Sequence, residues 1–428
     1  MNWLRGTGVR AALILGLLLV GSAHAQVAKA PGFKVGEGRL HPYLELDGRF
    51  DSLVGFFERD SGGNPIASSE LILHVRPGVK FDLDTPSTFV GFNGAAEYLW
   101  YTGLLSPGSR GLSRFQANVA LDTKFNRDGA AEVNLGDNLV RSDRTQNPAL
   151  GVGAISLYNG VYLAVPIHPG GRALEVTPKV SWGVEFFEAL LPGLVPFCTA
   201  GQASCDPSTV PQSNYSNLNF GLNARWKFLP KTALIVDVNA DWRTYFTNAA
   251  AAKVLFRAQG GIAGLISPRI AVTLLAGYGG DFTNNSIHTV IGTAEFSYTV
   301  TEQSRIAVGY ARNVIAVPLL GSMMDDRGYL RGGLGLLGGR LMLNAQVSLD
   351  YFSFLAQPTA ATTAPASSVR NDVLLSLSAG PTVTVTSWFD VSANYTFTFR
   401  SSKGTDVTNL PSLNFPRHEA LLRLNFHY

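Results

Sequence analysis

The stretch LNFGLNARWKF, residues 218–228, is followed after a short break by LIVDVNADWR, residues 234–243. In both, apolar residues occupy every second position and mainly polar residues stand between them. Because successive side chains of a strand point to opposite faces, this alternation predicts two β-strands with one apolar and one polar face each. The same pattern recurs at 71–81, 115–125, 176–186, 290–298, 341–351 and 385–399. Such segments are long enough for tilted strands to cross a bilayer, which takes about 9–11 residues.

The composition indicates that apolar residues are spread along the chain and not gathered in long runs. Only 15% of the 428 residues are charged and 45 are glycine, whereas soluble domains average about 25% charged residues. After Val20 no stretch reaches the roughly 18 consecutive apolar residues that mark a helical membrane span. The formal net charge is only +3, and no basic cluster indicates a nucleic-acid partner.

The first 25 residues have the layout of a secretory signal peptide. Arg5 and Arg10 precede an apolar run at 11–20, and Ala23 and Ala25 lie just before the expected cleavage at Gln26. The apolar run is too short for a membrane-spanning helix, which needs roughly 20 residues. We therefore expect a signal peptide at 1–25, a short periplasmic segment at 26–40 and a single barrel at 41–428.

Two kinds of connection alternate between the predicted strands. Turn residues mark tight connections at 85–86, 126–129, 169–171, 229–231, 267–268, 302–303, 338–339 and 380–381. Longer polar segments lie at 58–69, 107–112, 141–151, 191–216, 247–252, 281–286, 317–326, 357–368 and 401–414. This rhythm predicts an all-β, up-and-down antiparallel barrel of about 18 strands. The number falls to 16 if the weakly patterned segments 158–165 and 328–337 are not strands.

The last segment, EALLRLNFHY at 419–428, alternates in the same way and stops on an aromatic residue. Leu422, Leu424, Phe426 and Tyr428 share its apolar face. This resembles the C-terminal assembly signal of bacterial outer-membrane β-barrel proteins of the porin-like type. Arg423 stands where that pattern often has glycine, so the match is partial. The resemblance implies an outer-membrane location, lipid contact and recognition by the barrel assembly machinery, and it implies no particular activity.

Charged residues of both signs fall on the polar face of the predicted strands. The candidates for lining the lumen are Arg76, Arg114, Asp122, Arg225, Asp237, Asp241, Arg243, Arg257, Glu295, Arg305, Asp350 and Arg423. Rings of one sign would predict strong ion selectivity, whereas this mixture predicts a weakly selective, water-filled path. Many of these charges are also expected to pair across neighbouring strands and support the wall.

The two cysteines, Cys198 and Cys205, lie within the longest predicted loop. In an exported chain this spacing predicts one local disulfide. A metal site is the alternative, but no histidine stands nearby, and we expect no cofactor or metal. This disulfide would constrain the loop, which either folds into the lumen or remains at the surface.

The sequence therefore predicts a channel for passive diffusion of small hydrophilic solutes. A structural or surface-binding barrel closed by its loops is the first alternative. An outer-membrane hydrolase is the second, although no HExxH or GxSxG motif occurs. The GxGxxG string at Gly333 opens no predicted helix, so it does not indicate a dinucleotide site. The strands of a soluble β-sandwich, propeller or solenoid would also show alternating apolar and polar residues. The sequence is compatible with a monomer and with a homo-oligomer, because an oligomer interface would be as apolar as the lipid face.

Overall fold

The computed structural model describes residues 31–54, 69–142, 155–171, 173–188, 214–247, 252–283, 287–317, 321–355, 368–404 and 414–428. Its strands are β1 Phe33–Val35, β2 Gly38–Asp51, β3 Glu70–Asp84, β4 Thr88–Tyr101, β5 Arg114–Phe125, β6 Val133–Ser142, β7 Ser156–Ala164, β8 Leu174–Phe187, β9 Tyr215–Leu229, β10 Thr232–Tyr245, β11 Lys253–Ser267, β12 Ile270–Asp281, β13 Ile287–Thr301, β14 Ser304–Val317, β15 Gly321–Leu336, β16 Leu341–Leu355, β17 Ser368–Thr386, β18 Phe389–Gly404 and β19 Phe415–His427. In the described ranges, two short 3-10 helices, η1 Pro107–Leu112 and η5 Leu337–Gly339, lie between strands. No helix in the described ranges is long and apolar enough to cross a membrane.

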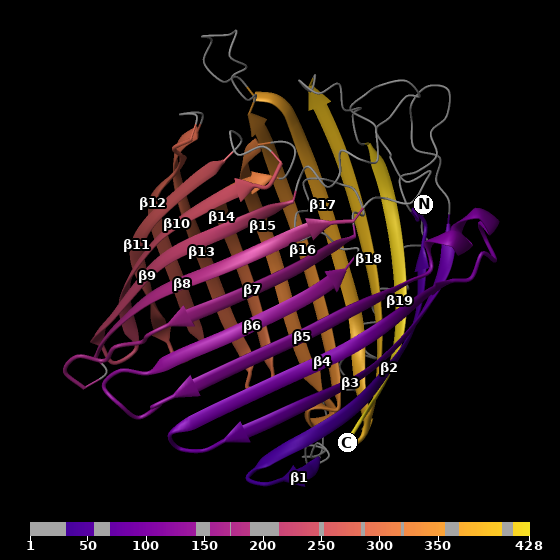
Figure 1. Cartoon of the computed structure of the whole chain (residues 1–428), viewed down its shortest axis with the longest axis horizontal. Coiled ribbons are helices and arrows are strands. Elements are labelled where there is room, and N and C mark those ends of the chain that lie inside the picture. Colours follow the sequence, from indigo (N-terminus) through magenta and orange to yellow (C-terminus); the bar gives the residue numbers. More distant parts are fainter. Residues whose placement is uncertain are drawn as a thin grey trace, which may run out of the picture.

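Strands β2–β19 form a closed barrel (Figure 1). Each pairs antiparallel with the next strand in the chain, and β19 returns to pair with β2 from Glu419↔Asp51 to His427↔Tyr43. The wall therefore has 18 strands in the described part of the chain, and the predicted barrel class and strand number are confirmed. The weakly patterned segments form β7 and β15, so the 16-strand alternative is wrong.

Short connections gather at one end of the barrel, where β1 and the C-terminus also lie (Figure 1). We call this the turn end and the opposite one the loop end. At the turn end, the ring centroids of Phe33 and Tyr428 are 4.5 Å apart, and those of Phe389 and Phe426 are 4.8 Å apart. The Tyr428 amide also donates to the Pro42 carbonyl at 3.1 Å. The chain's two described ends are thereby joined at the barrel seam.

One predicted turn, at 380–381, is wrong. Strand β17 runs through it, and the chain reverses at 387–388 instead. A Cβ atom at Gly380 would overlap the Ala393 carbonyl oxygen, so glycine is needed there for close approach of β18. Pro381 has no N–H to donate, and the recorded β17–β18 pairing skips these two positions. Turn-type residues here accommodate a tight strand contact.

The predicted loop at 317–326 is also wrong for most of its length. Strand β14 continues to Val317, and β15 begins at Gly321. The two remain paired up to Val317↔Gly321, so they form a long hairpin rather than two strands joined by a broad loop.

The wall has one apolar and one polar face. Large apolar side chains are exposed on the outside, as at Trp182, Phe220, Trp242, Leu349 and Leu422. The residues between them carry amides, hydroxyls and charges and face the opposite way. An apolar exterior of this extent is what a barrel surrounded by lipid requires.

Candidate functional site

The strand register carries one polar face around the inside of the barrel. Asp237 pairs with Asn223 on one side and Gln259 on the other, and Asn239 pairs with Arg257. Pairing places the sequence-predicted lumen residues on this inner face: Arg76, Arg114, Asp122, Arg225, Asp237, Asp241, Arg243, Arg257, Glu295, Arg305, Asp350 and Arg423. Their role in lining a path for solutes stays a prediction.

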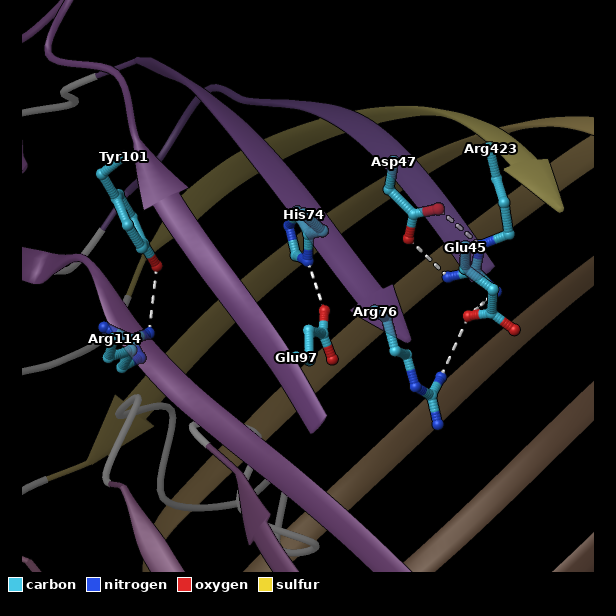
Figure 2. Close-up of polar contacts among 8 residues, drawn as sticks. All are labelled: Glu45, Asp47, His74, Arg76, Glu97, Tyr101, Arg114 and Arg423. Carbon is cyan, nitrogen blue, oxygen red and sulfur yellow. Dashed lines mark hydrogen bonds and ion pairs between the residues drawn. The ribbon is translucent and has the colours of Figure 1, made fainter. Parts of the chain in front are cut away.

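Across the seam, a ladder of ion pairs joins β19, β2 and β3 (Figure 2). Arg423 donates through Nε and Nη2 to the two carboxylate oxygens of Asp47, at 2.8 and 2.7 Å. Glu45 accepts from Arg76 at 3.2 Å and lies 3.8 Å from Arg423. Because such bidentate pairs fix the geometry of both side chains, the ladder supports the wall where the first and last strands meet.

The ladder continues onto β4 and β5 (Figure 2). Nδ1 of His74 lies 2.5 Å from an oxygen of Glu97, and Arg114 donates to the Tyr101 hydroxyl at 3.0 Å. Glu97 also lines a hollow of about 380 Å³, together with His74 and Arg423. The predicted candidates Arg76, Arg114 and Arg423 are thus brought into one region of the wall.

The β4–β5 connection is held over the inner face at the loop end. Glu70 is fully buried and accepts from the Thr102 hydroxyl at 2.8 Å and the Ser106 amide at 3.2 Å, as well as from the Ser109 hydroxyl. Leu112, at the end of η1, packs against a buried cluster that includes Leu99. The connection therefore narrows the loop end from this side.

The β14–β15 hairpin narrows the lumen from another side. Strands β13 and β14 are paired only as far as Gly292↔Arg312, although both continue beyond that point. The tip of β14 instead packs, through Val314, against Ile291 and Leu255, which belong to the inner faces of β13 and β11. The hairpin tip therefore lies on the lumen side of β11–β13 and doubles the wall there.

Polar contacts anchor this hairpin. Arg243 on β10 donates to the Ala316 carbonyl at 3.3 Å. The Ser322 hydroxyl donates to Asp281 at 2.6 Å, and the Lys253 ammonium lies 3.5 Å from the same carboxylate. Asp281 is fully buried. These anchors tie the inward position of the hairpin to β10, β11 and β12.

Further ion pairs near the loop end include side chains that are almost completely removed from solvent. The side chains of Arg400 and Asp372 are 1% and 0% exposed, and Nε of Arg400 donates to Asp372 at 3.1 Å. Arg327 pairs with Asp350, whose side chain is 1% exposed. Of these four residues, the sequence pattern predicted only Asp350 as a lumen residue. The inner face at this end is packed rather than open.

Arg49 is an exception among the buried charges. It is 5% exposed and lines the 380 Å³ hollow, and its Nε atom has no hydrogen-bond partner among the described residues. Its neighbours two positions along β2 have arginine partners of their own: Asp47 with Arg423, and Asp51 with Arg417 at 2.6 and 3.0 Å. The charge of Arg49 still acts on the Asp51 carboxylate, but no ion pair within 4 Å offsets the desolvation cost of the buried guanidinium among the described residues.

The turn-end half of the wall over β14–β18 has a second hollow, of about 400 Å³. Arg305 and Arg331 line it together with amide and hydroxyl side chains. Arg305 was predicted and Arg331 was not, because glycines on the outer face of β15 weaken the alternation at 328–337. The signal that could have found Arg331 is the inner series of Arg327, Tyr329 and Arg331.

Some predictions lie outside the described residues. Cys198 and Cys205, and with them the predicted disulfide, fall in 189–213, and the predicted signal peptide falls in 1–30. In the ranges that are described, no group of three or more His, Cys, Asp or Glu side chains is placed to hold a metal ion.

Comparison with known proteins gives similarities of fold at low identity. No family model matches the sequence, and no curated protein matches it. Solved barrels that align include OccAB3 of Acinetobacter baumannii, at 9% identity over 92% of this chain and 100% of that one, with a TM-score of 0.47. An anion-selective porin of Comamonas acidovorans aligns at 11% identity over 91% and 99%, with a TM-score of 0.41. A ferric enterobactin receptor of Pseudomonas aeruginosa aligns at 8% over 91% and 80%, with a TM-score of 0.48.

The class of the protein follows from its own wall rather than from these alignments. A closed 18-strand antiparallel barrel with an apolar exterior and a polar interior is a β-barrel of the outer-membrane type.

Proposed function

We propose that this chain forms a passive channel in the bacterial outer membrane for small hydrophilic solutes. The observation that carries the proposal is the mainly polar inner face, with hollows of about 380 and 400 Å³ in it. A barrel of this strand number is too wide for side chains from its own wall to fill, so water occupies what remains. Polar walls then offer solutes replacement hydrogen bonds as they lose part of their hydration.

The charges of the lumen support weak rather than strong ion selectivity. Acidic and basic side chains alternate along the ladder and are mostly paired, as in Arg423 with Asp47 and Arg76 with Glu45. A paired wall presents little net field of either sign to a passing ion. Within the described residues, the β4–β5 connection and the β14–β15 hairpin narrow the lumen, both at the loop end.

The two ends of the chain would serve export and assembly. Residues 1–25 would direct secretion, and β19 would be recognised by the barrel assembly machinery through Leu422, Leu424, Phe426 and Tyr428. Leu422 and Tyr428 are 53% and 47% exposed on the outer surface, where a recognising protein could reach them. We expect the lipid of the outer membrane to surround the barrel. Assembly into a homo-oligomer is compatible with the same apolar exterior.

Liposome swelling tests the channel. Refolded protein, residues 26–428, is placed in liposomes loaded with an impermeant polymer, and these are diluted into isotonic glycerol, arabinose, glucose or sucrose. We expect swelling that slows as the solute grows. Liposomes that contain verified folded barrel and do not swell in glycerol would contradict the channel.

A closed barrel that binds a partner is the second candidate, because specific groups at the loop end are packed. Glu70, Asp281 and Asp372 are all 0% exposed. If that packing extends across the lumen, solutes cannot pass and the exposed loops become the functional surface. Liposomes that fail to swell would favour this closed barrel. Esterase and protease assays on the same protein would test the hydrolase alternative.

A further inference from the structure

The wall over β14–β18 differs in chemistry from the ion-paired ladder over β19 and β2–β5. Its 400 Å³ hollow has no carboxylate among the lining residues in the described part of the chain. The lining instead combines two arginines with amides and a hydroxyl: Arg305, Arg331, Asn344, Gln346, Ser378 and Asn394. The volume falls within the range of about 300–1,000 Å³ that is typical of small-molecule sites.

Two of the amides are free to bind a solute. Asn344 and Gln346 are exposed toward the hollow, and neither side chain makes a hydrogen bond to another described residue. Ser378 is engaged differently, because its hydroxyl donates to Asn394 at 3.1 Å, which holds both in place. Since an amide offers donors and an acceptor together, it matches the hydroxyl groups of a polyol.

The two arginines leave positive charge beside these amides. The side chains of Arg305 and Arg331 are 60% and 54% exposed. Both are near the same carboxylate, Glu295, at 3.9 and 2.6 Å, and that carboxylate also accepts from the Tyr329 hydroxyl at 2.6 Å. Two guanidinium groups therefore share one acid, and a further carboxylate can bind to them.

We propose that this hollow binds a sugar acid, a polyhydroxylated solute with one carboxylate group. The carboxylate contacts Arg305 and Arg331, and the hydroxyls contact Asn344 and Gln346. This inference rests on the proposed channel, because it assumes that solutes reach the lumen, and it adds the chemical class that the wall favours.

Calorimetric titration of the refolded barrel in detergent tests the site, with gluconate and glucose as probes. We expect gluconate to bind at least about tenfold more tightly than glucose, as one charge-assisted hydrogen bond accounts for. Arg331→Gln should weaken gluconate binding about tenfold and leave glucose within about twofold. Asn344→Ala should weaken both sugars. Arg269→Gln, at the exposed β11–β12 turn, is the matched control and should change neither.

Equal binding of gluconate and glucose, or gluconate binding unchanged in Arg331→Gln, would overturn the site. If Arg331→Gln does not refold, Gln346→Ala, at an exposed position, tests the hydroxyl contacts instead: we expect weaker binding of both probes, and unchanged binding of both would overturn the site. Conductance of the same preparations separates the two proposals. Channel steps without gluconate binding refute the site alone, and gluconate binding without steps refutes the channel alone.

Discussion

Replacing Arg400 by methionine should destabilise the barrel and replacing Arg49 should not, although both are arginines buried on the inner face. Arg400 is 1% exposed and paired with the fully buried Asp372, so Arg400→Met takes the arginine away from a buried carboxylate. Removal of one partner from such a pair costs about 3–5 kcal/mol. An exposed ion pair would lose only about 0.2–1 kcal/mol.

Arg49→Met removes a buried guanidinium that makes no ion pair within 4 Å with any described residue, although its charge acts on Asp51. A buried charge has a desolvation cost of several kcal/mol, and its removal loses only this longer-range attraction among the described residues. Because methionine can pack against Ile72 and Leu421, which flank position 49 on the neighbouring strands, we expect unchanged or higher stability.

Equilibrium unfolding in guanidinium chloride, followed by tryptophan fluorescence in phospholipid vesicles, measures both. The double variant Arg400→Met with Asp372→Leu should recover most of the free energy of unfolding that Arg400→Met loses, because it also removes the buried carboxylate. Arg269→Met is the control and should stay within about 0.5 kcal/mol of the parent protein. Similar losses for Arg400→Met and Arg49→Met would refute the reasoning.

Three further changes probe the parts that shape the lumen. Ser322→Ala removes the hydrogen bond to Asp281 and loosens the β14–β15 hairpin, so single-channel conductance should become noisier or larger; an unchanged current would show that the hairpin does not limit flow. Glu70→Gln weakens the contacts that hold the β4–β5 connection and should lower the free energy of unfolding by about 1–3 kcal/mol, because buried donors lose a charged acceptor; limited proteolysis should then cut near 102–113, and protection equal to that of the parent would count against this role. Gly380→Val places a side chain against the Ala393 carbonyl and should abolish folding to the heat-modifiable form on gels, whereas normal folding would mean that β18 can move away.

The faces of the wall could be predicted from sequence because they follow from local alternation alone. The apolar series from Leu218 to Phe228 and the polar series beside it need no knowledge of neighbouring strands. For the same reason every predicted lumen charge, from Arg76 to Arg423, falls on the inner face in the structure. Alternation was weak in β7 and in β15, and in β15 glycine replaces larger outer residues, as at Gly328 and Gly332.

The partners of those charges could not be predicted, because they depend on register between strands that are distant in sequence. Arg423 meets Asp47 only because β19 closes on β2. The inward position of the β14–β15 hairpin likewise depends on where β13 and β14 separate, at Gly292↔Arg312. Turn residues were also ambiguous at 380–381, since glycine and proline serve a strand contact there.

The central claim is that the lumen is open to water and small solutes. Planar-bilayer recording of the refolded protein, residues 26–428, tests it most directly. We predict stable single-channel steps whose size rises in proportion to salt concentration, with little preference between cations and anions. The absence of steps from protein that is verifiably folded and inserted would contradict the claim and mean that the barrel is closed.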